Sequence, residues 1–493
     1  MIFTVIGAGI AALGLVLLAM GTRLQMLCFV FLCSLFNGSA TLVITALGSV
    51  SIPPALLATA FLALHCALPG CAREPTLPSA LAENGWLLLL VGYSVVGAFV
   101  LPTLFEGAIA VVPLRPSNNP LGLTAFPLRF STQNITTAAY MTLTLAGALC
   151  AHMAVRSAGA AARIARLASV IGLVHAAIGW SAAAARNTPV EPVFGFFRNG
   201  HYMQLDQDFA GFARLTGISP EPSLYASFGL IWFLFVTELW LRSVDRRWTG
   251  PAALVLLLTL IASTSTTAYV GLAAYSLVLL ARQVFLVGTI PAQKGLVIGA
   301  CLATLGASLL VLAAGNDAVA HALARVLRLT TADKLSSGSG IARLVWARQG
   351  IDAFLASWGF GIGAGSFRSS SIVTALLGSS GIVGMGAMAL YLLRVFRPLA
   401  QATWRRTGMA ELDVSSAAAW AVVMSLVPAS VSAPSPDPGL VWGLLAGSAL
   451  GLRRLAYGLY IAAPAPTRSK VVALGGERPG NRGYPGNGQH LPA

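Results

Sequence analysis

Arginine residues gather in three long stretches that separate the most apolar parts of this sequence, at about 105–136, 186–222 and 316–370. Arginine carries a planar fork of N–H donors, which fits a phosphate or diphosphate with two hydrogen bonds. As a set these residues indicate a polyanion site, although a single arginine in a long loop is also tolerated without any function. The basic residues of the three stretches are Arg115, Arg129, Arg186, Arg198, Arg214, Arg325, Arg328, Lys334, Arg343, Arg348 and Arg368.

One acidic residue, Glu221, stands between two prolines just ahead of the apolar run 223–241. The prolines restrict the backbone there, and Ser223 is placed to cap the helix that follows. A carboxylate held rigidly at this point can orient or deprotonate a hydroxyl group. An acidic residue is also favoured at any helix start by the helix dipole, so both interpretations of Glu221 stay open.

The stretch 339–368 combines a helical pattern with alternating glycines. Arg343, Trp346 and Gly350 share one face of a helix by their spacing. Gly363 and Gly365 belong to a segment in which backbone amides can approach an anion closely. The segment follows no expected strand, so it does not indicate a dinucleotide-binding turn.

The composition predicts a membrane protein. Of 493 residues, 56% are hydrophobic and only 10% are charged. A soluble chain carries about a quarter charged residues, and a charge at the bilayer centre costs at least ~2.5 kcal/mol. The formal charge of +15 is spread between apolar runs, which indicates membrane topology and argues against nucleic-acid binding.

Apolar runs of spanning length recur along the chain, because a span needs about 20 mostly apolar residues. We expect an all-α, polytopic integral membrane protein with about 12–13 transmembrane helices and a large helical periplasmic loop. Residues 1–461 form one membrane domain in this interpretation, and 462–493 form a disordered cytoplasmic tail. The expected spans are 2–20, 25–47, 53–69, 85–104, 137–155, 165–185, 223–241, 251–264, 267–281, 295–315, 371–393, 414–432 and 438–457.

Basic clusters between these spans predict the orientation. They all fall on one side of the membrane, and cytoplasmic loops are enriched in lysine and arginine. The three arginine-rich stretches are then extracytoplasmic. The clusters assigned to the cytoplasm are Arg156/Arg163/Arg166, Arg242/Arg246/Arg247, Arg282/Lys294, Arg394/Arg397/Arg405/Arg406 and Arg453/Arg454.

The order of the motifs resembles the Wzy-type polysaccharide polymerase and O-antigen ligase superfamily of bacterial envelopes. The matching features are R-x-x-G…E-P-S at 214–223, a small-hydroxyl turn at 263–269, and R-x-x-W at 343–346 with G-x-G-x-G-x-F at 361–367. The resemblance covers about residues 210–395 by motif, and the remainder by the number of spans.

The resemblance implies a membrane glycosyltransferase that takes a saccharide from a polyprenyl-diphosphate carrier at the outer face of the bacterial inner membrane. Arginines then stabilise the departing diphosphate more in the transition state than in the ground state. No metal or cofactor is expected. The implied diphosphate ligands are Arg214, Arg343, Arg348 and Arg368, the implied base is Glu221, and the implied accessory residues are Arg325, Arg328, Trp346, Gly363 and Gly365.

Three functions remain open from the sequence. The leading one is a polymerase that joins undecaprenyl-diphosphate-linked repeat units into an exopolysaccharide, capsule or O-antigen chain, with membrane lipids and a chain-length regulator protein as partners. A ligase is weaker, because Ser369–Ser371 stand where ligases of this superfamily typically carry a histidine. His201 and His321 lie on outer loops and are alternative bases or ordinary surface residues. A flippase is the third, and the near absence of charges within spans disfavours it.

Overall fold

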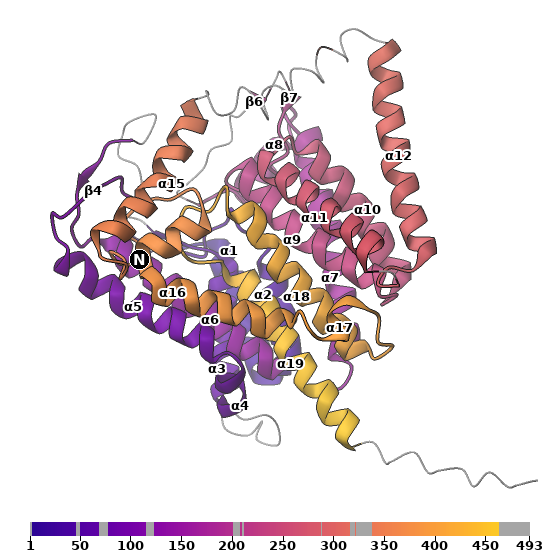
Figure 1. Ribbon diagram of the computed structural model, residues 1–493, viewed down its shortest axis with the longest axis horizontal. Coiled ribbons are helices and arrows are strands. Elements are labelled where there is room, and N and C mark those ends of the chain that lie inside the picture. Colours follow the sequence, from indigo (N-terminus) through magenta and orange to yellow (C-terminus); the bar gives the residue numbers. More distant parts are fainter. Residues whose placement is uncertain are drawn as a thin grey trace, which may run out of the picture.

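The chain forms a mostly helical bundle in the computed structural model, which describes residues 2–45, 50–68, 77–114, 123–200, 208–209, 212–286, 288–315, 321 and 338–462 (Figure 1). Seven of the described helices are long and apolar enough to cross a membrane. They are α5 (Gly85–Leu104), α6 (Thr132–Ala154), α7 (Ala160–Ala184), α9 (Pro222–Leu241), α11 (Thr266–Phe285), α16 (Ile372–Phe396) and α18 (Ala410–Ala429).

Further helices complete the bundle or lie at its ends, and α12 (Ala292–Gly315) runs along its edge (Figure 1). The shorter apolar ones are α1 (Val5–Met20), α2 (Arg23–Cys33) and α3 (Pro54–Ala67). The others are α4 (Leu77–Glu83), α8 (Glu191–Phe196), α10 (Arg246–Ala262), α12 (Ala292–Gly315), α15 (Gly338–Ala356), α17 (Gln401–Trp404) and α19 (Leu440–Ala462). A helix lies at twelve of the thirteen expected spans, and seven of these helices are long and apolar enough to cross a membrane.

The expected span at 25–47 is wrong. Helix α2 ends at Cys33, and the chain then forms the strands β2 (Leu42–Ile44) and β3 (Val50–Ile52). They pair antiparallel, and β2 also pairs with β1 (Ile2–Phe3). The Asn37-Gly38 dipeptide is a turn signal that ends the helical pattern, and the β-branched residues after it favour strands.

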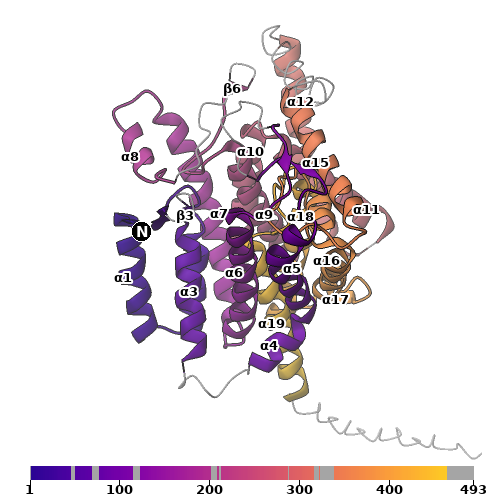
Figure 2. The same ribbon diagram turned by 90° about the vertical axis from the view of Figure 1, so that its left-hand side faces the viewer.

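The helices give the bundle two distinct ends (Figure 2). At the loop end lie the described parts of the connections 105–131 and 186–221, the connection 357–371, and the small hairpins β4–β5 (Ala110–Val111 with Phe126–Pro127) and β6–β7 (Asp208–Phe209 with Phe212–Ala213). At the basic end lie the connections after α1, α6, α9 and α16. The three arginine-rich stretches therefore contribute to one end and the predicted cytoplasmic clusters to the other.

The segment 357–371 inserts into the bundle at the loop end. Residues 361–367 are buried, and α16 is broken at Gly381, which has φ +60°. The amides of Ile362 and Ile382 donate to Gly378 O (2.8 Å) and Gly359 O (2.9 Å), so the inserted segment and the break satisfy each other's backbone groups. Non-helical backbone is tolerated at such depth only when protein covers it, as it does here.

Buried charges form a network at the basic end, and Glu238 is its one member that lies within an expected span. Glu238 of α9 is fully buried and is ion-paired with Arg282 of α11. It also accepts a hydrogen bond from Tyr275 Oη at 2.9 Å, and Arg242 Nε lies 3.7 Å from its Oε2. Arg242 in turn lies 3.8 Å from Asp413 at the start of α18. The charges of the two acids and the two arginines balance, and the network connects α9, α11 and α18. We call this network the clamp.

Candidate functional site

The turn that carries Arg214 is built by two other arginines. Arg186 Nη2 donates to Arg214 O at 2.5 Å, and Arg198 Nε donates to Gly217 O at 2.9 Å. Gly217 has φ +54° and lies against the Tyr225 ring, where a Cβ would come within 3.0 Å. Glycine is required there because other residues disfavour positive φ. Arg186 and Arg198 therefore position the turn, and the guanidinium of Arg214 is held half-buried beside it.

Glu221 lies at the N-terminus of α9 and is its N-cap residue. The helix begins at Pro222, so the expectation that Ser223 caps it is wrong; Ser223 is its second residue. The Ser223 hydroxyl donates to Glu221 Oε1. This bond fixes the direction of the carboxylate at the loop end.

Helix α15 presents Arg343, Trp346 and Gly350 on its inward side, as their spacing predicts. A Cβ on Gly350 would come within 2.3 Å of Thr374 O, so this glycine allows close packing of α15 on α16. Arg343 Nη1 donates to Val431 O at 3.4 Å. Arg348 is different: its side chain is 80% exposed, and its Nε lies 3.9 Å from Asp352. The structure does not bring Arg348 together with the other arginines.

A set of hydrogen bonds around the Gln349 side chain, which we call the Gln349 clasp, holds Arg368 in place. Gln349 Oε1 accepts from Val112 N at 2.7 Å, and its Nε2 donates to Arg368 O at 3.1 Å. The Arg368 amide donates to Val112 O at 2.9 Å, and its guanidinium lies 4.4 Å from the centroid of the Trp346 ring. Its Nη1 donates to Leu114 O, whereas the buried Nε has no partner among the described residues. Gln349 was not predicted from the sequence because no sequence pattern marks a single glutamine whose side-chain amide becomes buried.

The charges of these residues act on one another. Burial lowers the pKa of Arg214, the charge of Arg343 lowers it further, and Glu221 raises it. Burial also lowers the pKa of Arg343, which Glu221 raises and Arg368 lowers. We name Arg214, Arg343, Arg368 and Glu221 the arginine cluster. It holds three cations and one carboxylate in partly buried positions, which favours the binding of an anion.

The glycines of 359–365 have a different role from the one expected. Gly363 and Gly365 have φ +97° and +87°, and a Cβ on them would come within 2.8 Å of Gly97 O and 2.4 Å of Gln133 O. The Gly363 amide donates to Ser379 O at 3.0 Å and is not available to an anion. These glycines let the inserted segment pack on α5 and α6. They support the arginine cluster through the position of Arg368.

A further acidic residue, Asp437 in the connection that Arg343 contacts, was not predicted. It lies in the connection between α18 and α19, whose Val431 O and Pro434 O accept from Arg343 and from the Ser369 amide. Its Oδ1 accepts from Thr144 Oγ1 at 2.9 Å and from Gly439 N at 3.1 Å. Burial raises the pKa of Asp437, and these two hydrogen bonds lower it. An acid among prolines, as at Glu221, is the sequence signal that would have found it.

Several predicted residues lie outside the described part of the chain or take structural positions. Arg115, Arg325, Arg328, Lys334 and His201 lie outside the described residues, as does the tail from 463. Ser369, Ser370 and Ser371 are buried; Ser370 Oγ donates to Arg343 O at 2.6 Å and joins the inserted segment to α15.

The small-hydroxyl turn at 263–269 connects α10 to α11, as expected. Its Tyr269 hydroxyl donates to Ile261 O at 2.9 Å, and this tyrosine lies close enough to affect the Arg214 charge.

A scan of protein-family models and searches of curated proteins and of solved structures found no match to this chain.

Proposed function

We propose that this protein is a glycosyltransferase of the bacterial inner membrane that polymerises polyprenyl-diphosphate-linked oligosaccharide repeat units at the periplasmic face. The observation that carries the proposal is the arginine cluster at the loop end of a bundle of membrane-length helices. A lipid diphosphate is a polyanion presented at the membrane surface, and guanidinium groups bind it through paired hydrogen bonds.

The proposed reaction transfers the growing chain from its carrier. A hydroxyl of the acceptor saccharide attacks the anomeric carbon of the donor, a new C–O bond forms, and the bond to the diphosphate breaks. Polyprenyl diphosphate leaves with the electron pair. Arg214, Arg343 and Arg368 stabilise the negative charge that develops on it, and such preplaced charges lower the barrier.

The proton of the attacking hydroxyl passes to a carboxylate. Glu221 is one candidate, although its position among cations and its bond from Ser223 also suit a residue that orients the arginines. Asp437 is the second candidate, since its raised pKa brings it closer to the pH of the reaction. Separate substitutions of the two acids distinguish their roles.

The exposed apolar face of α15 suits the polyprenyl tail. Ile341, Leu344 and Leu355 are 48%, 66% and 65% exposed. They lie on the same helix as Arg343, which allows a lipid to reach the cluster from the bilayer. Apolar side chains of this kind are covered at low cost by a hydrocarbon chain.

The test is the glycan pool of cells that lack this gene, with polyprenyl-linked and exported material separated and sized. We expect single repeat units to accumulate on the carrier or on the acceptor while long polymer disappears. Long polymer that remains on the carrier would instead indicate a ligase. Lipid-linked units confined to the cytoplasmic leaflet would indicate a flippase, and an unchanged pool would overturn every one of these functions.

A further inference from the structure

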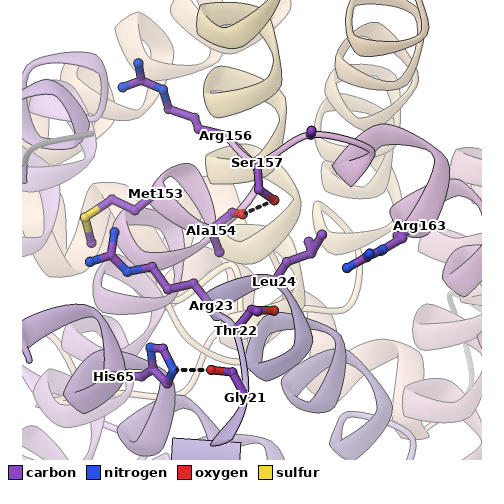
Figure 3. Close-up of a pocket in the computed structure, with 11 residues that line it drawn as sticks. Gly21, Thr22, Arg23, Leu24, His65, Met153, Ala154, Arg156, Ser157 and Arg163 are labelled. Carbon is purple, nitrogen blue, oxygen red and sulfur yellow. Dashed lines mark hydrogen bonds between the residues drawn. The ribbon is translucent and has the colours of Figure 1, made fainter. Parts of the chain in front are cut away.

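A cavity of about 410 Å³ lies at the basic end, at the other end of the bundle from the arginine cluster. Figure 3 shows the residues that line it. The cavity lies where the turn between α1 and α2 meets the end of α3 and the connection from α6 to α7. The residues that line it are Gly21, Thr22, Arg23, Leu24, His65, Met153, Ala154, Arg156, Ser157, Ala158 and Arg163.

The lining is strongly basic. Arg23, Arg156 and Arg163 are lining residues from three different segments, and none of the lining residues is acidic. Figure 3 shows their side chains pointing in different directions. Within the described residues, neither Arg23 nor Arg163 forms an ion pair, and Arg23 Nε is buried without a hydrogen-bond partner. An anion bound in the cavity would offset the positive charge of its lining.

A histidine adds a polar group to the same wall. His65 is buried, and its Nε2 lies 3.1 Å from Gly21 O, to which it donates. Its Nδ1 is buried and has no partner among the described residues. Buried polar atoms are rarely left without a partner in native proteins. Because Nε2 carries the proton, Nδ1 is an acceptor, and its missing partner is a donor such as a hydroxyl group of a headgroup.

We propose that this cavity binds the phosphate of an anionic phospholipid headgroup. Its position at the ends of α1, α3 and α6 is the level at which headgroups lie, and basic pockets between helices suit such phosphates. Apolar side chains next to the lining support a lipid over free phosphate: Met20, Leu64 and Leu68 are 85%, 48% and 44% exposed. Acyl chains attached to the bound phosphate would cover them.

The bound lipid would hold the N-terminal helices to the rest of the bundle. Arg23 begins α2, Arg156 lies in the connection between α6 and α7, and Arg163 lies in the first turn of α7. A phosphate bound in the cavity would connect the start of α2 with the segments that carry Arg156 and Arg163. The lipid therefore stabilises the folded chain by binding it in preference to unfolded states.

The experiment compares two double variants of the full chain that remove the same charge from the same end. Arg23→Gln/Arg163→Gln alters the cavity, and Arg246→Gln/Arg247→Gln alters exposed positions outside it. Each protein is purified in mild detergent and titrated with phosphatidylglycerol, phosphatidylcholine or inorganic phosphate. The thermal midpoint and the amount of retained phospholipid of each class are measured.

We expect phosphatidylglycerol to raise the midpoint of the wild-type chain and of the control, while phosphatidylcholine and inorganic phosphate do not. The cavity variant should lose about tenfold or more in affinity, because two charge-assisted contacts are removed. Arg23→Lys/Arg163→Lys, which keeps the charge but loses the planar fork, should retain an intermediate affinity and shows that a folded chain is being compared. Equal losses in cavity and control variants would overturn the site, and a response to inorganic phosphate alone would overturn its assignment to a lipid.

Discussion

Arg343 is the residue on which the proposed chemistry depends most, because its charge is coupled to Arg214, Glu221 and Arg368. Arg343→Lys keeps one charge but loses the bidentate fork. We expect the rate of transfer to fall by about 10²-fold, the loss seen when one preplaced donor is removed from an anionic transition state. Arg348→Lys is the matched control on the same helix, and its exposed position predicts a rate close to wild type. Equal rates for the two variants in a polymer-length assay would remove Arg343 from the site.

The roles of Glu221 and Asp437 can be distinguished by how the rate of transfer depends on pH in variants of each residue. If Asp437 accepts the proton, its ionised form is the active one, so the rate falls as the pH drops through its raised pKa. Asp437→Asn should lower the rate and remove this acidic limb from the pH–rate profile. Glu221→Gln should lower the rate and leave the limb in place. A limb that persists in Asp437→Asn would exclude Asp437 as the base.

At the scale of elements, the inserted segment 357–371 depends on its glycines. Gly363→Ala places a methyl group at φ +97° against Gly97 O and Pro102 Cδ, both within 2.8 Å. We expect a loss of about 2–5 kcal/mol of stability, from backbone strain and overpacking together. Gly386→Ala in α16 meets open space and should be stabilising by about 0.5–1 kcal/mol. Thermal unfolding in detergent measures both, and a tolerated Gly363→Ala would contradict the packing role.

The clamp between α9 and α11 makes a second prediction at this scale. Glu238→Ala leaves the buried Arg242 and Arg282 without their shared carboxylate. Breaking a buried pair in this way costs about 3–5 kcal/mol. Arg166→Ala breaks the pair with Asp245, in which Arg166 is 57% exposed, and should cost at most about 1 kcal/mol. Similar unfolding midpoints for the two variants would show that the buried network contributes little.

The sequence predicts those helices best that correspond to long apolar runs. The span at 85–104 coincides with α5 because a run of this length has no alternative in a membrane. The span at 25–47 was wrong because its second half is short, β-branched and preceded by Asn37-Gly38. The contact of α15 with α16 follows from Gly350, whereas the Gln349 clasp joins residues from three distant segments and no local pattern indicates it.

At the scale of the whole molecule, the orientation in the membrane is open to a direct test. The basic clusters predict that the loop end faces the periplasm. In a variant that lacks the native cysteines, we introduce a cysteine at the exposed position Arg129 of the loop end or at Arg247 of the basic end. A membrane-impermeant maleimide should label only Arg129→Cys when added to cells with a permeable outer membrane. Labelling of Arg247→Cys alone would invert the orientation and remove the arginine cluster from the proposed substrate.

The central claim is that the arginine cluster transfers saccharides from a polyprenyl diphosphate. The most direct measurement uses the purified full chain in lipid nanodiscs with lipid-linked saccharide extracted from cells lacking the gene, and follows product length and released carrier together. We predict a ladder of longer saccharides with one polyprenyl diphosphate released for each new linkage, and at least about 10²-fold slower formation with Arg343→Ala. Failure of the wild-type chain to form any longer product, or an equal yield from Arg343→Ala, would contradict the proposed function.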